Sequence, residues 1–427
     1  MTGVALEFRR GPGRLLALPL AVLGIFFVWQ SLHAGPAVWP FVVSGVGLSA
    51  SILGPLAGGV AAFAGIRNHR RRTDSLELLA VRGPAASGIA QLVALVAWVA
   101  IAYVAIVVVV YTRAALTATW AGPSGFRTLA IGLGLLLHVV VGFVLGRAIP
   151  SRLTPPLTVV ALYGISVVNT VANSGYLWSA FLPIDIHSVD EFSRLKPAFS
   201  PGQALWSMGI AVVITSAWVL GRGRPHGRAA GSLVVGVGLG AIGASLLLSL
   251  NGAPFESGNI FAWTCQGTDP QICIHSALES GRPEITAAVI PVTGRLSGTP
   301  FAIHRAEQRE RGPDYTAPMG ATAYALDDLR PESLQLLGQE LSVSALGNDG
   351  CFRLLASSDN ALPTAYDLNQ IVVASVGGTP SSFTPVDSAA KKAQRWFDKI
   401  DDQHRKVWLS AHEKAIRDCS LAYSAFQ

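Results

Sequence analysis

The chain has 427 residues, of which 51% are hydrophobic and only 14% are charged, with a formal net charge of +6. Soluble domains carry about 25% charged residues, so this composition excludes a set of ordinary soluble domains and indicates an integral membrane protein. Residues 1–250 contain 17 Lys or Arg against 6 Asp or Glu, whereas residues 251–427 contain 15 against 20. Because the basic excess accompanies the apolar half, no exposed basic surface is left for nucleic acid, and we predict no nucleic-acid partner.

Seven apolar stretches precede residue 251, each near the roughly 20 residues that a helix needs to cross a bilayer. They cover residues 15–32, 38–66, 87–111, 128–149, 157–174, 204–220 and 229–250. We therefore predict an α-helical polytopic membrane domain of about seven transmembrane helices at 1–250, followed by an extracytoplasmic α+β domain at 251–427. Asn169, Thr170 and Asn173 lie near the end of the fifth stretch, and a re-entrant hairpin is the alternative there.

Basic residues mark the cytoplasmic ends of transmembrane helices, and here they divide unequally between the two sides. Thirteen precede the first stretch or follow the second, fourth and sixth: Arg9, Arg10, Arg14, Arg67, Arg70, Arg71, Arg72, Arg82, Arg147, Arg152, Arg222, Arg224 and Arg228. Four lie in the other connections: Arg113, Arg127, Arg194 and Lys196. The chain is thus expected in the cell membrane with its amino terminus in the cytoplasm and its carboxyl-terminal domain outside. Cleavage of the first stretch as a secretory signal near Ala34–Ala37 is an alternative that leaves the rest unchanged.

The four cysteines all lie in the segment placed outside: Cys265, Cys273, Cys351 and Cys419. An even number in an oxidising compartment favours two disulfides, with free thiols as the alternative. Of the three connectivities, proximity favours Cys265 with Cys273 and leaves Cys351 with Cys419.

The outer segment shows a mixed pattern of short strands and a terminal helix. Residues 285–292, 352–356 and 371–376 resemble strands, the last being rich in β-branched residues. From Ser388 to Ala422, apolar residues recur at helical spacing and predict an amphipathic helix, with a break near Asp401 and Asp402. Its expected apolar stripe contains Trp396, Ile400, Val407, Ala411 and Ala415. Packing of this stripe on the domain is the first interpretation, and a helix lying on the membrane through Trp396, Phe397 and Trp408 is the second.

The loop after the second stretch carries the most informative motif. Residues 70–84 read RRRTDSLELLAVRGP, in which Leu76, Leu79 and Ala80 share one face of a short helix that Pro84 ends. Such a helix offers an apolar ridge with charged flanks to a cytoplasmic partner. The plainer interpretation, a basic membrane anchor followed by an amphipathic linker, fits the residues equally well.

This basic cluster, followed by Ser-Leu-Glu-Leu-Leu and by Gly-Pro before the third stretch, resembles the first cytoplasmic loop of ABC-2 type transporter permeases. That resemblance implies a coupling helix that docks into a separate ATP-binding subunit. The docking residues would be Leu76, Glu77, Leu78 and Leu79, flanked by Arg70, Arg71 and Arg72. The family usually has six spans, so the seventh span and the outer domain are additions. Longer permease-like proteins of this shape occur in actinobacteria, and 26 Arg against 6 Lys fit a GC-rich genome.

Motifs for chemistry within the chain are missing. No Gly-Lys pair occurs, so the Walker A pattern is absent and any ATP would be hydrolysed by another polypeptide. Gly238–Gly243 matches a dinucleotide-binding pattern but lies inside the seventh stretch, where Gly236 and Gly240 better suit close helix packing. The outer histidines lack metal-ligand spacing, and no Gly-x-Ser-x-Gly elbow is present. We therefore expect no enzyme activity, no cofactor and no metal.

Three polar residues lie within the apolar stretches and are candidates for a polar path. His138 lies deep in the fourth stretch, and Asn169 and Asn173 lie four residues apart on one face of the fifth. Hydrogen bonds to a neighbouring helix explain all three as well.

The leading hypothesis is a permease subunit of an ATP-driven transporter, acting as a homodimer or heterodimer with a cytoplasmic ATP-binding subunit. The second is a non-transporting membrane receptor or assembly protein whose outer domain binds a ligand or partner.

Overall fold

The computed structural model describes residues 3–11, 13–31, 37–70, 83–120, 122–171, 180–184, 192, 194–221, 227–251, 254–256, 263–309, 321–326, 329–347, 363–378 and 388–427. The chain forms two compact units. Unit 1 contains Met1–Leu32 and Ala37–Asn259, and unit 2 contains Ile260–Gln427. The boundary lies slightly after the one predicted at residue 250, because the segment after the last apolar helix stays in unit 1, where Phe255 forms an antiparallel bridge with Leu195.

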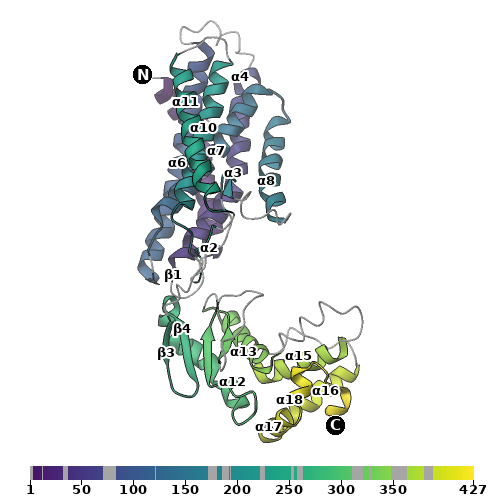
Figure 1. Cartoon of the computed structure of the whole chain (residues 1–427). Coiled ribbons are helices and arrows are strands. Elements are labelled where there is room, and N and C mark those ends of the chain that lie inside the picture. The colour runs from purple at the N-terminus through teal and green to yellow at the C-terminus, as the bar shows by residue number, and fades with distance from the viewer. Residues whose placement is uncertain are drawn as a thin grey trace. The chain divides into compact units, whose positions relative to one another are not determined.

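Unit 1 is a bundle of helices with one small pair of strands (Figure 1). The helices are α1 (Gly3–Arg10), α2 (Gly13–Ser31), α3 (Trp39–Gly65), α4 (Arg67–Arg70), α6 (Gly83–Thr117), α7 (Gly125–Ala148), α8 (Thr154–Val171), α10 (Phe199–Leu220) and α11 (Gly227–Leu248). Strands β1 (Ala37–Val38) and β2 (Ala118–Trp120) pair in parallel. Helices dominate because an apolar segment in lipid must satisfy its backbone hydrogen bonds internally.

Each of the seven predicted apolar stretches lies on one of these helices, namely α2, α3, α6, α7, α8, α10 and α11. Five of them, α3, α6, α7, α10 and α11, are long and apolar enough to cross a membrane. Within the described residues, α2 and α8 contribute the shorter apolar stretches Gly13–Trp29 and Thr154–Val167. Length and composition therefore identify a helical membrane protein with five clear candidate spans.

Glycines allow two pairs of helices in unit 1 to approach closely. A Cβ added at Gly142 or Gly146 of α7 would clash with the backbone of α3 at Gly58 or Ala62. On α11, a Cβ at Gly243 would clash with the backbone of α10 at Trp206. The interpretation of Gly236, Gly240 and Gly243 as packing residues is therefore confirmed, because all three are buried in α11. Gly238 does not share this role, since nothing lies within 4 Å of a Cβ there.

Unit 2 is built on a mixed four-stranded sheet with strand order β3-β4-β5-β6. The strands are β3 (Trp263–Gln266), β4 (Gln271–His275), β5 (Arg305–Gln308) and β6 (Thr322–Tyr324). Strand β3 is antiparallel to β4, whereas β4, β5 and β6 run parallel. The helices are η1 (Ser276–Gly281), α12 (Arg282–Leu296), α13 (Pro331–Leu346), α15 (Pro363–Gly377), α16 (Ser388–Lys399), α17 (Asp402–Ala411), α18 (Glu413–Arg417) and η2 (Tyr423–Ala425).

Two of the three strands predicted for this unit were wrong. Residues 285–292 lie in α12, and residues 371–376 lie in α15. In α12 the buried residues Ile285, Val289, Val292 and Leu296 recur at helical spacing, and this tertiary packing overrides their β-branched preference. Helix α15 is buried on nearly all sides from Leu368 to Val376, and periodicity cannot separate such a run from a buried strand. The third prediction, at 352–356, lies outside the described residues.

The terminal segment was predicted correctly in type and in its break near Asp401, but it breaks again at His412 and its last α-helix ends at Arg417, not at Ala422. Helix α16 ends at Lys399. Asp401 caps α17, since its carboxylate accepts a hydrogen bond from the His404 backbone N–H at 2.9 Å. The predicted stripe was wrong, because Val407 is 61% exposed while Phe397 and Trp408 are buried. The break at Asp401 resets the helical phase, so the buried face changes. Burial of Phe397 and Trp408 inside unit 2 also removes two of the three anchors of the membrane-lying alternative.

The first disulfide was predicted correctly. Cys265 of β3 lies directly opposite Cys273 of β4 and the two are bonded. Cys419 is also disulfide-bonded, and none of the described cysteines is free. Cys351 lies outside the described residues, so its pairing with Cys419 stays a prediction.

Candidate functional site

The predicted docking segment lies outside the described residues, including Arg71, Arg72, Leu76, Glu77, Leu78 and Leu79. The structure does describe the helices on both sides of it. Helix α4 ends at Arg70, whose guanidinium lies 5.1 Å from the centre of the Phe63 ring, and α6 begins at Gly83. The contacts of these flanking helices therefore define what the segment is attached to.

An ion pair joins the helix before the segment to the amino terminus of the chain. Arg67 of α4 donates two hydrogen bonds to the Glu7 carboxylate of α1, at 2.9 and 3.0 Å. The side chains of Arg67 and Glu7 are 20% and 24% exposed, so water and salt screen the attraction between the two charges only in part. Next to Glu7, Phe8 stacks on Trp98 of α6 with ring centres 4.4 Å apart, and the Trp98 indole donates to the Phe8 carbonyl at 2.8 Å. Helix α1 thus ties α4 to α6.

A second polar pair joins the helix after the segment to α7. The Arg147 guanidinium donates to the Gln91 side-chain oxygen at 2.8 Å, and both residues are buried. Arg147 also lies over the Phe143 ring, with 5.6 Å to the ring centre. A buried charge near the end of an apolar helix is costly unless polar groups surround it, and Gln91 supplies one.

The two pairs belong to one polar cluster, here called the loop base and made of Glu7, Arg67, Gln91, Trp98 and Arg147. Glu7, Arg67, Gln91 and Trp98 line a common cavity of about 10 Å³, which is room for about one water molecule. The loop base links α1, α4, α6 and α7 at the point where the predicted docking segment leaves and re-enters unit 1.

Sequence reasoning counted Arg67 and Arg147 only as topology markers and missed the loop base. Glu7 is one of only six acidic residues in the first 250. An acidic residue so rare in this half was the one feature of the sequence that could have indicated an ion pair with a nearby Arg. Nothing in the spacing of Gln91 and Arg147, which lie 56 residues apart, indicated their contact.

His138 of α7 is buried, and its Nδ1 lies 2.8 Å from the Gly134 carbonyl of the same helix. The expected bond to a neighbouring helix is therefore wrong for this nitrogen. The ring contacts α3 by packing instead, since a Cβ at Gly54 would lie 3.0 Å from Nδ1. Asn169 lies in α8 with its side chain outside the description, and Asn173 lies outside the described residues.

A short non-helical segment enters the bundle next to His138. The carbonyl of Pro183 approaches Gly134 so closely that any Cβ there would clash with it. The preceding carbonyls are satisfied by α10, because Gln203 donates to Leu182 at 3.2 Å and Trp206 donates to Phe181 at 3.0 Å. Irregular backbone at membrane depth is stable only with such internal partners.

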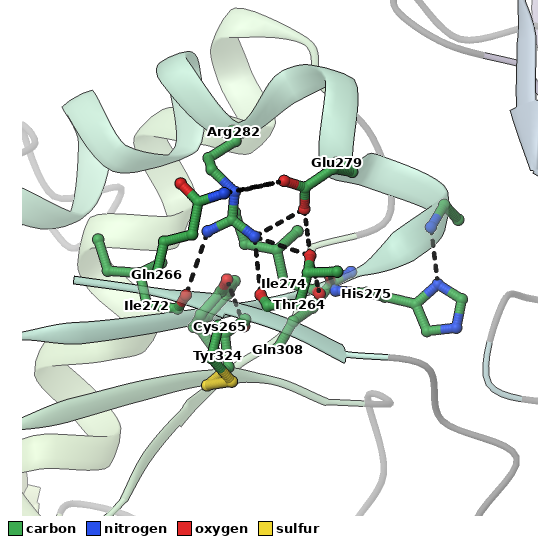
Figure 2. Close-up of polar contacts among 12 residues, drawn as sticks. Thr264, Cys265, Gln266, Ile272, Ile274, His275, Glu279, Arg282, Gln308 and Tyr324 are labelled. Carbon is green, nitrogen blue, oxygen red and sulfur yellow. Dashed lines mark hydrogen bonds and ion pairs between the residues drawn. A yellow bond between two sulfur atoms is a disulfide. The ribbon is translucent and has the colours of Figure 1, made fainter. Parts of the chain in front are cut away.

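In unit 2, Arg282 is the centre of a polar network (Figure 2). Its guanidinium donates to both carboxylate oxygens of Glu279, at 2.7 and 2.6 Å, to the Ile272 carbonyl at 3.2 Å, and to the Thr264 carbonyl at 2.7 Å. The hydrogen bonds from Arg282 hold the pKa of Glu279 below its ordinary value. Arg282 therefore fastens β3, β4, η1 and α12 together.

The carboxyl ends of β4, β5 and β6 are where ligands bind in sheets of parallel strands. Here the polar groups at this edge are engaged with one another. Gln308 accepts a hydrogen bond from the His275 backbone N–H at 2.9 Å and donates to the Leu326 carbonyl at 2.9 Å. Tyr324 donates to the Cys273 carbonyl at 3.2 Å, and burial raises the pKa of Tyr324 above its ordinary value. This edge is built for stability of the sheet.

Of these features, only the loop base joins the helices on both sides of residues 71–82 to other helices of unit 1. Among the residues that the structure describes, no group of three His, Cys, Asp or Glu residues is placed to hold a metal ion. Comparison of the chain with protein-family models, with curated proteins and with solved structures finds no match.

Proposed function

We propose that this chain is the permease subunit of an ATP-driven transporter of the ABC-2 type, coupled to a separate ATP-binding subunit through the segment at residues 71–82. In this proposal α2, α3, α6, α7, α8, α10 and α11 cross the membrane. The amino terminus lies in the cytoplasm and unit 2 lies outside. The permease works as a homodimer or heterodimer.

The observation that carries the proposal is the loop base. The helix before the segment is fastened through Arg67 to Glu7, and the helix after it is fastened through Gln91, eight residues beyond Gly83, to Arg147. A displacement of the segment by a partner would therefore be transmitted to α1, α6 and α7 together. A plain basic anchor needs only positive charge and has no use for these pairs.

Close packing supplies the rigid bodies that such a mechanism requires. Glycine contacts join α3 to α7 and α10 to α11, and tightly packed helices move as units because packed interfaces do not deform continuously. Nucleotide-driven closure of the ATP-binding subunits would push on residues 71–82 and rock these bodies against α2 and α6. The buried contacts of Ala17, Leu20 and Val28 support retention of α2 as a span.

The test is purification of the full chain from gently solubilised native membranes. The proposal expects a protein with Walker motifs to copurify and the complex to hydrolyse ATP. Purification that never yields such a protein, together with absence of associated ATPase activity, would overturn the proposal.

The second candidate is a membrane receptor or assembly protein, and the independence of unit 2 favours it. Unit 2 has its own sheet, its own buried core and a disulfide. This candidate expects a partner bound to unit 2 after the same purification and no dependence of that partner on residues 71–82.

A further inference from the structure

The lysines of this chain are concentrated in its last helices. Five of the six are Lys391, Lys392, Lys399, Lys406 and Lys414. Residues 388–427 contain 8 Lys or Arg against 5 Asp or Glu, whereas residues 251–387 contain 7 against 15. Positive charge is thus separated from the acidic segment that precedes it.

Helix α16 carries four cations on one side, here called the basic face and made of Lys391, Lys392, Arg395 and Lys399. At about 100° per residue, these four residues fall within roughly 100° of the helix circumference. All four are exposed. Asp398, at the edge of the basic face, is the one carboxylate in the sequence of α16, so four cations against one carboxylate leave the helix with a net charge of +3.

The opposite side of α16 holds the helix in unit 2. Ala390, Ala393 and Phe397 are buried there, and the centre of the Phe397 ring lies 4.9 Å from that of Trp408 and 6.0 Å from that of Phe426. Because these apolar residues are packed inside the unit, they cannot insert into a bilayer, as the apolar side of an interfacial helix does. A partner of α16 must therefore be held by charge.

Within the described part of the chain, no carboxylate forms an ion pair with the basic face. The Arg395 guanidinium donates to a backbone carbonyl of α16 itself at 3.2 Å. The carboxylates that follow the helix are engaged with α17, since Asp401 lies 2.7 Å from His404 and Asp402 lies 2.8 Å from Arg405. The basic face thus offers its charge to an anionic partner outside unit 2.

The anionic partner that the chain itself keeps nearby is the membrane surface. Helix α11 is a candidate span that ends at Leu248, and unit 2 begins at Ile260. So short a connection gives the bilayer a high effective concentration around unit 2. Clusters of about four to eight Lys or Arg residues on an amphipathic helix bind anionic lipids, and the basic face has this number and arrangement.

We propose that the basic face of α16 binds the phosphate groups of anionic phospholipids in the leaflet next to unit 2. The contact is independent of the proposed transport function, because it needs neither residues 71–82 nor an ATP-binding subunit.

The first test uses the full chain in nanodiscs of phosphatidylcholine, which offer no anionic lipid to the basic face. Cosedimentation is measured with vesicles of phosphatidylcholine and with vesicles of phosphatidylcholine mixed with phosphatidylglycerol. Only the mixed vesicles should retain the chain, and salt at about 1 M, where the Debye length is about 3 Å, should release it. Equal retention by both kinds of vesicle, or no retention by the mixed ones, would overturn the proposal.

A matched pair of double variants locates the charge that binds. Lys391→Gln/Lys399→Gln removes two charges from the basic face, and Lys406→Gln/Lys414→Gln removes two charges of the same kind from α17 and α18. Each Lys near an anionic surface strengthens binding about fivefold, so the first variant should bind the mixed vesicles roughly 25-fold more weakly. The second should bind nearly as the wild type does. Equal weakening in both would assign the attraction to the net charge of the unit and overturn the role of the basic face.

Lysine acetylation tests the contact within a single membrane. The full chain is acetylated in nanodiscs of phosphatidylcholine and in nanodiscs that also contain phosphatidylglycerol, and each lysine is followed by mass spectrometry. Phosphatidylglycerol should slow the acetylation of Lys391, Lys392 and Lys399 several-fold relative to Lys406 and Lys414. Unchanged acetylation would show that the basic face does not bind its own membrane. Equal protection in both kinds of nanodisc would show burial against protein, such as a second copy of the chain. Either result would overturn the proposal.

Discussion

Gln91→Leu is the sharpest perturbation of the loop base. The change keeps the side-chain volume nearly constant and removes the oxygen that accepts the Arg147 hydrogen bond at 2.8 Å. A hydrogen bond to a charged group contributes about 1.5–3 kcal/mol, and burial of both residues places the expected loss within that range. The free energy of unfolding should fall by this amount, which is roughly a ten- to hundredfold change in the folding equilibrium.

The control is Gln203→Leu, which changes a second buried glutamine away from the loop base. Gln203 donates to a neutral carbonyl, that of Leu182, at 3.2 Å, and such a bond contributes about 0.5–1.5 kcal/mol. Unfolding is followed by helical circular dichroism in detergent micelles, and association of the ATP-binding subunit is measured at matched abundance. Only Gln91→Leu should weaken association. Unchanged stability of Gln91→Leu, or equal loss of association in both variants, would refute the role of the loop base.

Further outcomes follow from the other contacts. Gly243→Leu should prevent α10 and α11 from packing and reduce the yield of monodisperse protein, whereas Gly238→Leu on the same helix should not, because nothing lies within 4 Å of a Cβ there. Non-reduced peptide mapping should recover Cys265 with Cys273 and Cys351 with Cys419, the latter closing a loop worth about 4 kcal/mol in the chain-entropy model. The folded-state pKa of Glu279 lies below its ordinary value of 4.5, so its stabilising contribution is present above that value and is lost as pH falls through the folded pKa. Glu279→Gln lacks this contribution at every pH. Unit 2 of the variant should therefore be less stable at neutral pH and should lose less stability on acidification than unit 2 of the wild type. A cytoplasm-specific reporter should be active after Arg82 or Arg228 and inactive after Gln427.

The apolar helices could be predicted because length and hydropathy alone determine a membrane helix. All seven stretches lie on helices, and the glycines of α11 pack as their four-residue spacing indicated. The strand predictions at 285–292 and 371–376 were wrong for the same reason. Runs of Ile and Val prefer strands locally, and only the surrounding sheet and helices of unit 2 decide that they form α12 and α15.

Polar partners were the least predictable feature of the molecule. Glu7 and Arg67 lie 60 residues apart and Gln91 and Arg147 lie 56 apart, and no local pattern connects residues at such separations. Arg282 lies near Glu279 in sequence, yet its bonds to Thr264 and Ile272 depend on the β3–β4 pairing. The disulfide was accessible to sequence reasoning because Cys265 and Cys273 are only 8 residues apart.

The central claim is that residues 71–82 dock an ATP-binding subunit, and Leu79→Asp tests it most directly. An unpaired charge in a dry contact costs several kcal/mol, so association should weaken by orders of magnitude, while Glu77→Gln should cost about 1 kcal/mol or less. Leu153→Asp is the matched control, because Leu153 is 65% exposed in the α7–α8 connection on the same proposed side of the membrane. The measurement is copurification of the ATP-binding subunit at equal membrane abundance. The account predicts loss of the subunit in Leu79→Asp alone, and its undiminished copurification with Leu79→Asp would contradict the account.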